Sequence, residues 1–125
     1  MPTDLPTTLI FIGRVLLGAA FFIFGLRNAM GLDRLTAAMT ARGLPMPRVC
    51  MVIGVAMQIL GGASVALNVL PILGAIDMIV FLLVAVFLFH NFWDYPQAER
   101  RQHVNAWIMN IGLSGAFLMV IAHSL

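Results

Sequence analysis

The sequence contains little charge, and its charges are of few kinds. Only 10% of its 125 residues are charged, against roughly 25% in a typical soluble domain, whereas 62% are apolar. Lysine is missing, so the seven basic residues are all arginine, and they are spread along the chain. A dispersed net charge of +2 provides no nucleic-acid-binding patch. This composition excludes a soluble globular domain and indicates an integral membrane protein embedded in the lipid bilayer.

Cysteine is nearly absent as well, since Cys50 is the single one. One cysteine cannot form an internal disulfide or a Cys-x-x-Cys redox pair, which excludes the thiol-relay class of small quinone-linked membrane proteins. The sequence contains no cysteine cluster, no haem-attachment motif and no nucleotide-binding loop. We therefore expect no metal site, and no cofactor held covalently or by a motif.

Apolar residues gather in four long runs, and the mean hydropathy of the chain is +1.01. A span needs about 20 mostly apolar residues, so the chain accommodates four spans and little else. We expect them at about 7–30, 48–70, 72–91 and 104–123. An amphipathic pattern over about 32–42 predicts a short helix lying in the membrane interface. The expected fold is all-α, an antiparallel four-helix transmembrane bundle forming one domain over residues 1–125.

Glycine and proline mark where these helices end. Gly43 suits the residue after the interfacial helix, and Pro71 suits the first turn of the third span. Pro96 stops that span, and we expect residues 97–103 to form a polar link. His103 and His123 lie near the two ends of the fourth span, where we expect them to be solvated.

Small residues recur on single faces of the first two spans. Gly18 and Gly25 share a face of the first, and Gly61 follows Gln58 on a face of the second, with Gly62 beside it. Small residues let membrane helices approach closely. We therefore predict that these four glycines form helix-packing surfaces.

Two charged residues lie inside the apolar runs, Arg14 in the first span and Asp77 in the third. Each is about one and a half turns from the start of its span, and the two spans run in the same direction. Charges at that depth are costly unless they pair or reach the surface. We predict an ion pair between Arg14 and Asp77; the alternative is that Arg14 snorkels to the nearby headgroups.

Uncharged polar residues lie inside the second and fourth spans and around the end of the third. They are Gln58, His90, Asn91, Trp93 and Asn110. Buried amides often join helices by hydrogen bonds, which is one interpretation of Gln58 and Asn110. The other is an amphiphile site, in which His90, Asn110 and Trp93 surround a quinone-like head group. His90 is thirteen residues after Asp77, so these two cannot share one helix face.

The arginines outside the apolar runs occur in or beside only two connections. They are Arg27, Arg34, Arg42 and Arg48 around the first connection, and Arg100 and Arg101 in the third. With four spans, these connections lie on one side of the membrane. The positive-inside rule places that side in the cytoplasm and both termini outside.

The ordered set of features resembles the DoxX family of small four-helix membrane proteins. The features are Arg14, the loop ending Arg42-Gly43-Leu44-Pro45-Met46-Pro47, the Gln58-Ile59-Leu60-Gly61-Gly62 core, the Phe89-His90-Asn91-Phe92-Trp93 segment, and Asn110. In that family the position of Gln58 often holds Glu, and the residue before the last Asn often holds Lys. This chain has Gln58 and Met109 at these two positions, so both differences remove a charge on which redox or proton chemistry could depend.

The resemblance implies a bacterial inner-membrane protein that serves as an accessory subunit of a quinone-linked redox complex. It implies a polar intramembrane site that could take a quinone or a lipid, and it assigns no catalytic residue. The alternative is a structural or assembly partner, which would dock another membrane protein or a second copy through its glycine faces. Small-solute transport is a third class, for which four spans in one copy leave little room.

Overall fold

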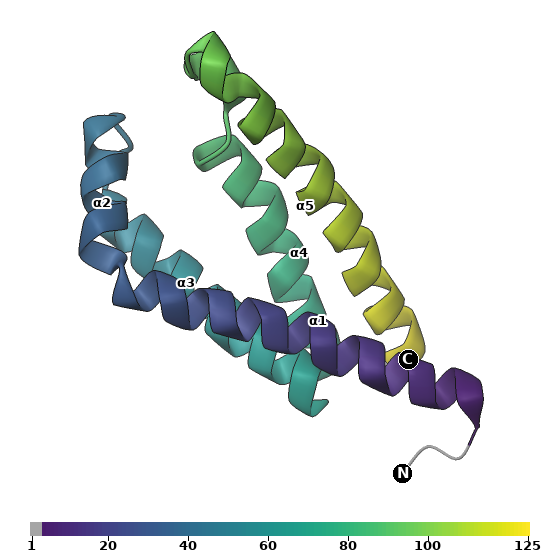
Figure 1. The fold of residues 1–125 in the computed structure, drawn as a ribbon. Coiled ribbons are helices and arrows are strands. Elements are labelled where there is room, and N and C mark those ends of the chain that lie inside the picture. The colour runs from purple at the N-terminus through teal and green to yellow at the C-terminus, as the bar shows by residue number, and fades with distance from the viewer. Residues whose placement is uncertain (1–3) are drawn as a thin grey trace.

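The structure is a computed structural model that describes residues 4–125, and its regular elements are all helical (Figure 1). They are α1 (Leu5–Met30), α2 (Leu32–Ala41), α3 (Pro47–Leu67), α4 (Pro71–Leu88), the 3-10 helix η1 (Phe92–Asp94) and α5 (Gln97–Ser124). Within the described part, four helices are long and apolar enough to cross a membrane. The predicted all-α fold, with a short helix between the first two spans, is confirmed. Residues 1–3 of the predicted domain lie outside the described residues.

The largest difference from the predicted boundaries is at the start of α5. Residues 97–103 form its first two turns instead of a polar link. They contain no Gly or Pro to break the helix, and Glu99 in the first turn is favourable at a helix N-terminus. Pro96 precedes this helix as its N-cap residue. The polar segment thus extends a span beyond its apolar part.

The third span, by contrast, ends early, at Leu88. In a longer helix, the carbonyl oxygens of the next two residues would accept hydrogen bonds from backbone N–H groups. Here side chains donate those hydrogen bonds instead. Tyr95 Oη donates a hydrogen bond to the Phe89 oxygen at 3.0 Å, and Trp107 Nε1 donates to the His90 oxygen at 2.8 Å. Carbonyls at a helix end need such partners, so these two bonds stabilise the turn of the chain toward α5.

Helices α1 and α3 approach most closely at glycines. A Cβ atom on Gly62 would lie 2.6 Å from the Gly18 oxygen, and one on Gly18 would lie 2.5 Å from the Gly62 oxygen. Gly25 lies against Gln58 and Ile59 in the same interface. Only residues without a side chain permit these backbones to come so close.

The core lies where the α1–α3 pair meets the α4–α5 pair, which cross in Figure 1. Its fully buried side chains come from three helices. They include Val65 of α3, Met78 of α4 and Phe117 of α5. Phe21 of α1 contacts Phe117 with ring centroids 5.5 Å apart, so all four long helices contribute to one core.

Candidate functional site

A central cavity of about 440 Å³ is lined by residues of α1 to α5 and of the segment after α4. Its polar lining residues are Asn28, Gln58, His90, Tyr95, His103 and Asn110. The rest of the wall is mainly apolar and includes Leu35 and Met39 from the apolar face of α2. A mostly apolar cavity with a few convergent polar groups, of about 300–1,000 Å³, is typical of small-molecule sites.

Two amides meet on the α1–α3 wall of this central cavity. Asn28 Nδ2 donates a hydrogen bond to Gln58 Oε1 at 2.8 Å. Gln58 is only 6% exposed, and Gly25, one turn before Asn28, allows α1 to reach it. This bond joins the two helices and leaves the Asn28 oxygen and the Gln58 amide hydrogens for other partners.

Two histidines meet on the opposite side. The Nδ1 atoms of His90 and His103 are 2.9 Å apart, a hydrogen bond in which one ring donates and the other accepts. In a neutral pair, the donating ring therefore keeps an acceptor at Nε2, and the accepting ring keeps a donor at Nε2. Tyr95 stacks on His103 with ring centroids 3.6 Å apart. The pair thus retains one donor and one acceptor, supported by an aromatic ring.

Arg42 connects α2 to the segment that carries these groups. Its Nη2 donates to Asn91 Oδ1 at 2.6 Å, and Asn91 Nδ2 donates to Asp94 Oδ2 at 2.7 Å. The Arg42 guanidinium also lies over the Tyr95 ring, 4.1 Å from its centroid. This network of Arg42, Asn91, Asp94 and Tyr95 ties the end of α2 to one end of the central cavity.

The structure brings some of the predicted residues together and separates others. Gln58, His90 and Asn110 line the central cavity, and Asn91 belongs to the Arg42 network. Asn110 Nδ2 donates to the Leu82 oxygen at 3.1 Å, so it also joins α5 to α4. Trp93 is 50% exposed and is not among the residues that line the cavity, so the structure does not group it with His90 and Asn110. The aromatic residues that line the cavity are Phe21, Phe81, Phe89 and Tyr95.

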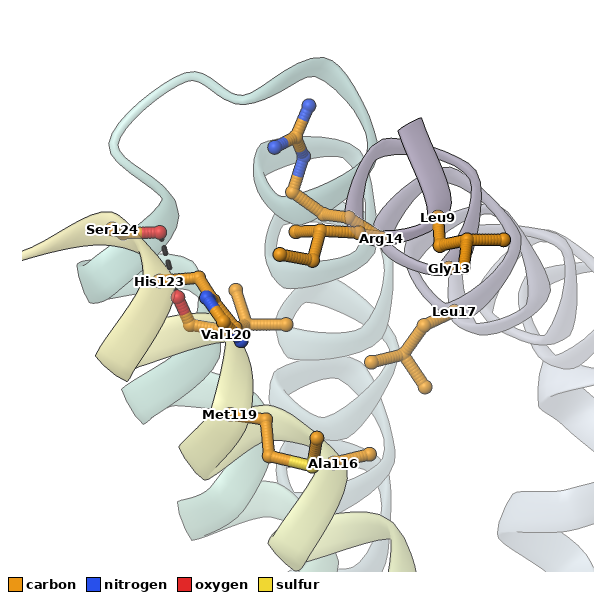
Figure 2. A pocket seen from close by; sticks show the side chains of 10 residues that line it. Leu9, Gly13, Arg14, Leu17, Ala116, Met119, Val120, His123 and Ser124 are labelled. Atoms are coloured by element: carbon orange, nitrogen blue, oxygen red, sulfur yellow. Dashed lines mark hydrogen bonds between the residues drawn. The ribbon is translucent and has the colours of Figure 1, made fainter. Parts of the chain in front are cut away.

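The predicted ion pair between Arg14 and Asp77 is absent. Among residues 4–125 the salt bridge formed is Arg48–Asp33, at 2.8 Å on the surface. Arg14 lines a groove between α1 and α5 (Figure 2), whereas Asp77 lines a different groove between α3 and α4. The Asp77 carboxylate lies against Gly61, so α3 stands between it and α1. Equal depth in two spans does not bring side chains together when their helices are not neighbours.

Three residues of the site carry roles that the sequence analysis did not assign. His103 is paired with His90 rather than solvated, Tyr95 stacks on it, and Arg42 forms a structural network besides marking topology. The feature of the sequence that could have indicated the histidine pair is the aromatic segment ending in Pro96. This segment turns the chain back, so that two histidines separated by thirteen positions in the sequence become neighbours. No group of three His, Cys, Asp or Glu in residues 4–125 is arranged to hold a metal ion.

Comparison with known proteins agrees with the resemblance. The DoxX family model matches residues 9–91, about two thirds of the chain. The chain is also 29% identical over 113 residues to the inner membrane protein YphA of Escherichia coli strain K12, covering 90% of this chain and 80% of that protein. No solved structure matches it. Because the family model covers most of the chain, and the fold has the four spans expected of it, this protein belongs to the DoxX family.

Proposed function

We propose that this protein is an accessory subunit of a quinone-linked redox complex and binds the head group of a quinone in its central cavity. The observation that carries the proposal is the His90–His103 pair facing the Asn28–Gln58 pair across one mostly apolar cavity. A quinone carbonyl needs a hydrogen-bond donor, and a quinol hydroxyl also needs an acceptor. The histidine pair retains one of each.

The chemistry of the lining residues limits what the subunit does. A bound quinone would supply the redox chemistry, while the histidines would hold its head group and Tyr95 would keep His103 in place by stacking on it. The lining offers no residue that carries electrons itself. The protein would therefore contribute a binding site, and electrons would come from a partner subunit.

The location proposed for the chain is a bacterial inner membrane, which the name of the relative YphA supports. We propose that the arginine-bearing connections face the cytoplasm and that both termini lie outside. In that orientation the central cavity, with the Arg42 network at its end, lies in the cytoplasmic half of the bilayer.

The alternative role, docking through glycine faces, has less support. Gly18, Gly25 and Gly62 are occupied by contacts between α1 and α3, and Gly61 lies against Asp77 and Met78 of α4. These surfaces are used inside one copy and are not free to bind a partner.

Quinone binding can be tested by titrating the purified protein with a short-chain ubiquinone and following tryptophan fluorescence. Trp107 donates a hydrogen bond to the His90 oxygen, so a quinone beside His90 should quench it. We expect saturable quenching by the wild type. Gly54→Leu should weaken it, because Gly54 lines the cavity and its added side chain would fill the space.

The matched control is Gly112→Leu, the same change where an added Cβ atom meets nothing within 4 Å and the residue lies outside the cavity lining. It should bind quinone as the wild type does. His103→Phe keeps a ring for stacking on Tyr95 but removes the nitrogen that pairs with His90, and should also weaken quenching. Equal quenching of all four proteins would refute the proposed site.

A further inference from the structure

A second cavity, here called the α1–α5 groove, has a volume of about 410 Å³ and lies between the first half of α1 and the end of α5 (Figure 2). It is lined by Leu9, Ile10, Gly13, Arg14, Leu17, Ala116, Met119, Val120, His123 and Ser124. This groove and the central cavity have no lining residue in common. The two sites are therefore separate.

The polar groups of the α1–α5 groove are directed toward one of its ends. His123 and Ser124 lie where α5 ends, and the Arg14 guanidinium points away from Ala116 and Met119, which lie deeper (Figure 2). The other lining residues of α1 are Leu9, Ile10, Gly13 and Leu17, which are apolar. The first and last lining residues on each helix are eight residues apart, which is about 12 Å at 1.5 Å per residue. A groove with this gradient matches a molecule that has a polar head and a hydrocarbon tail.

Arg14 lacks a partner in the described chain. Its Nε atom is buried without a hydrogen bond, and its guanidinium lies 5.6 Å from the Phe11 ring centroid. No carboxylate is among the residues that line the groove. Because an uncompensated cation inside a bilayer is costly, a bound anion would stabilise it.

The direction of the Arg14 side chain indicates where that anion would be. Helical side chains lean toward the N-terminus of their helix, and Arg14 lies about 14 Å along α1 from Leu5 at 1.5 Å per residue. In Figure 2 the guanidinium points away from Met119 and Ala116. The charge is therefore directed toward the end of the α1–α5 groove where α1 begins, and Met119 and Ala116 lie on the other side of it.

We propose that the α1–α5 groove binds one anionic phospholipid of the surrounding bilayer. The phosphate pairs with the Arg14 guanidinium, and one acyl chain lies between Leu17 of α1 and Met119 of α5. The net positive charge of the site selects an anionic headgroup over a zwitterionic one. This inference does not depend on the central cavity or on quinone binding.

The test is native mass spectrometry of the protein in detergent micelles containing equal amounts of phosphatidylglycerol and phosphatidylcholine. We expect the wild type to retain one phosphatidylglycerol molecule, with about tenfold preference, because its headgroup has a net negative charge whereas the choline cation of phosphatidylcholine is repelled by Arg14. Arg14→Gln should bring the ratio of the two lipids close to one, and Arg14→Lys should keep most of the preference. Gly13→Leu should abolish retention of both, because Gly13 lines the groove and its Cβ atom would meet no other atom within 4 Å.

Two controls make the result specific. Gly112→Leu is equally free of contacts but lies outside the groove lining, and Arg27→Gln removes an exposed arginine from the other end of α1. Both should retain lipid as the wild type does. Equal retention of the two lipids by the wild type would overturn the proposal. Retention that Gly13→Leu leaves unchanged would also overturn it, because it would show lipid bound on the outer surface only.

Discussion

The contact between α1 and α3 should make Gly62 one of the least replaceable residues of the protein. A Cβ atom at this position would lie 2.5 Å from the Phe22 nitrogen, 2.6 Å from the Gly18 oxygen and 3.1 Å from the Phe22 Cα. Ordinary contacts of a Cβ atom are 3.4–4 Å. All three obstructing atoms belong to the backbone of α1, so the helix would have to move as a whole.

The size of the effect follows from two opposing contributions. Overpacking a core costs about 1–3 kcal/mol, and backbone obstruction puts Gly62→Ala at the upper end. Alanine favours a helix over glycine by up to about 1 kcal/mol. The expected net loss is about 2 kcal/mol in the free energy of unfolding, roughly a thirtyfold change in the unfolding constant.

This loss can be measured by unfolding in mixed micelles with increasing SDS, followed by circular dichroism. Gly112→Ala is the matched control, because it is the same substitution in a helix where a Cβ atom meets nothing within 4 Å. It should be as stable as the wild type or slightly more stable. Equal unfolding free energies for Gly62→Ala and Gly112→Ala would refute the close approach of α1 and α3.

Three further predictions concern polar groups and topology. Gln58→Leu should lower the free energy of unfolding by about 1–2 kcal/mol in the same assay, because it removes the acceptor of the Asn28 amide. If the double variant with Asn28→Ala loses only the sum of the two single losses, the two side chains do not interact. Gln58→Glu should be less stable than the wild type at neutral pH, because it places a carboxylate where the side chain is 6% exposed. If Gln58 only joins helices, this variant should gain no activity, and quinone-dependent turnover would contradict a purely structural role for Gln58. A reporter fused after Leu125 should behave as extracytoplasmic, and a cytoplasmic signal would reverse the proposed orientation.

The surface ion pair offers a contrast to these buried groups. Arg48 and Asp33 have side chains 61% and 92% exposed, so the 2.8 Å bond between them is screened by water. Arg48→Gln should change stability by less than about 1 kcal/mol. Breaking the Gln58–Asn28 bond should cost more.

The sequence by itself determined the number of spans and the short helix between the first two. Apolar run length decides which segments can cross a bilayer, and Gly43 and Pro71 fix local backbone conformation whatever the rest of the chain does. Pro96 does not end the third span as predicted, because α4 already ends at Leu88, and it precedes α5 instead. The glycine faces could be identified for the same reason, since spacing along a helix defines its faces.

Only the tertiary structure decided which faces meet. Sequence position gives the depth of Arg14 and Asp77 but not the order of helices around the bundle, and these two side chains line different grooves. The pairing of His90 with His103 depends on how the segment after α4 turns back. A hydrogen bond from Tyr95 within this segment and one from Trp107 of α5 stabilise that turn. Helical periodicity is a local property, whereas the contacts that build the central cavity join residues far apart in the chain. The same packing leaves Arg14 unpaired in the α1–α5 groove.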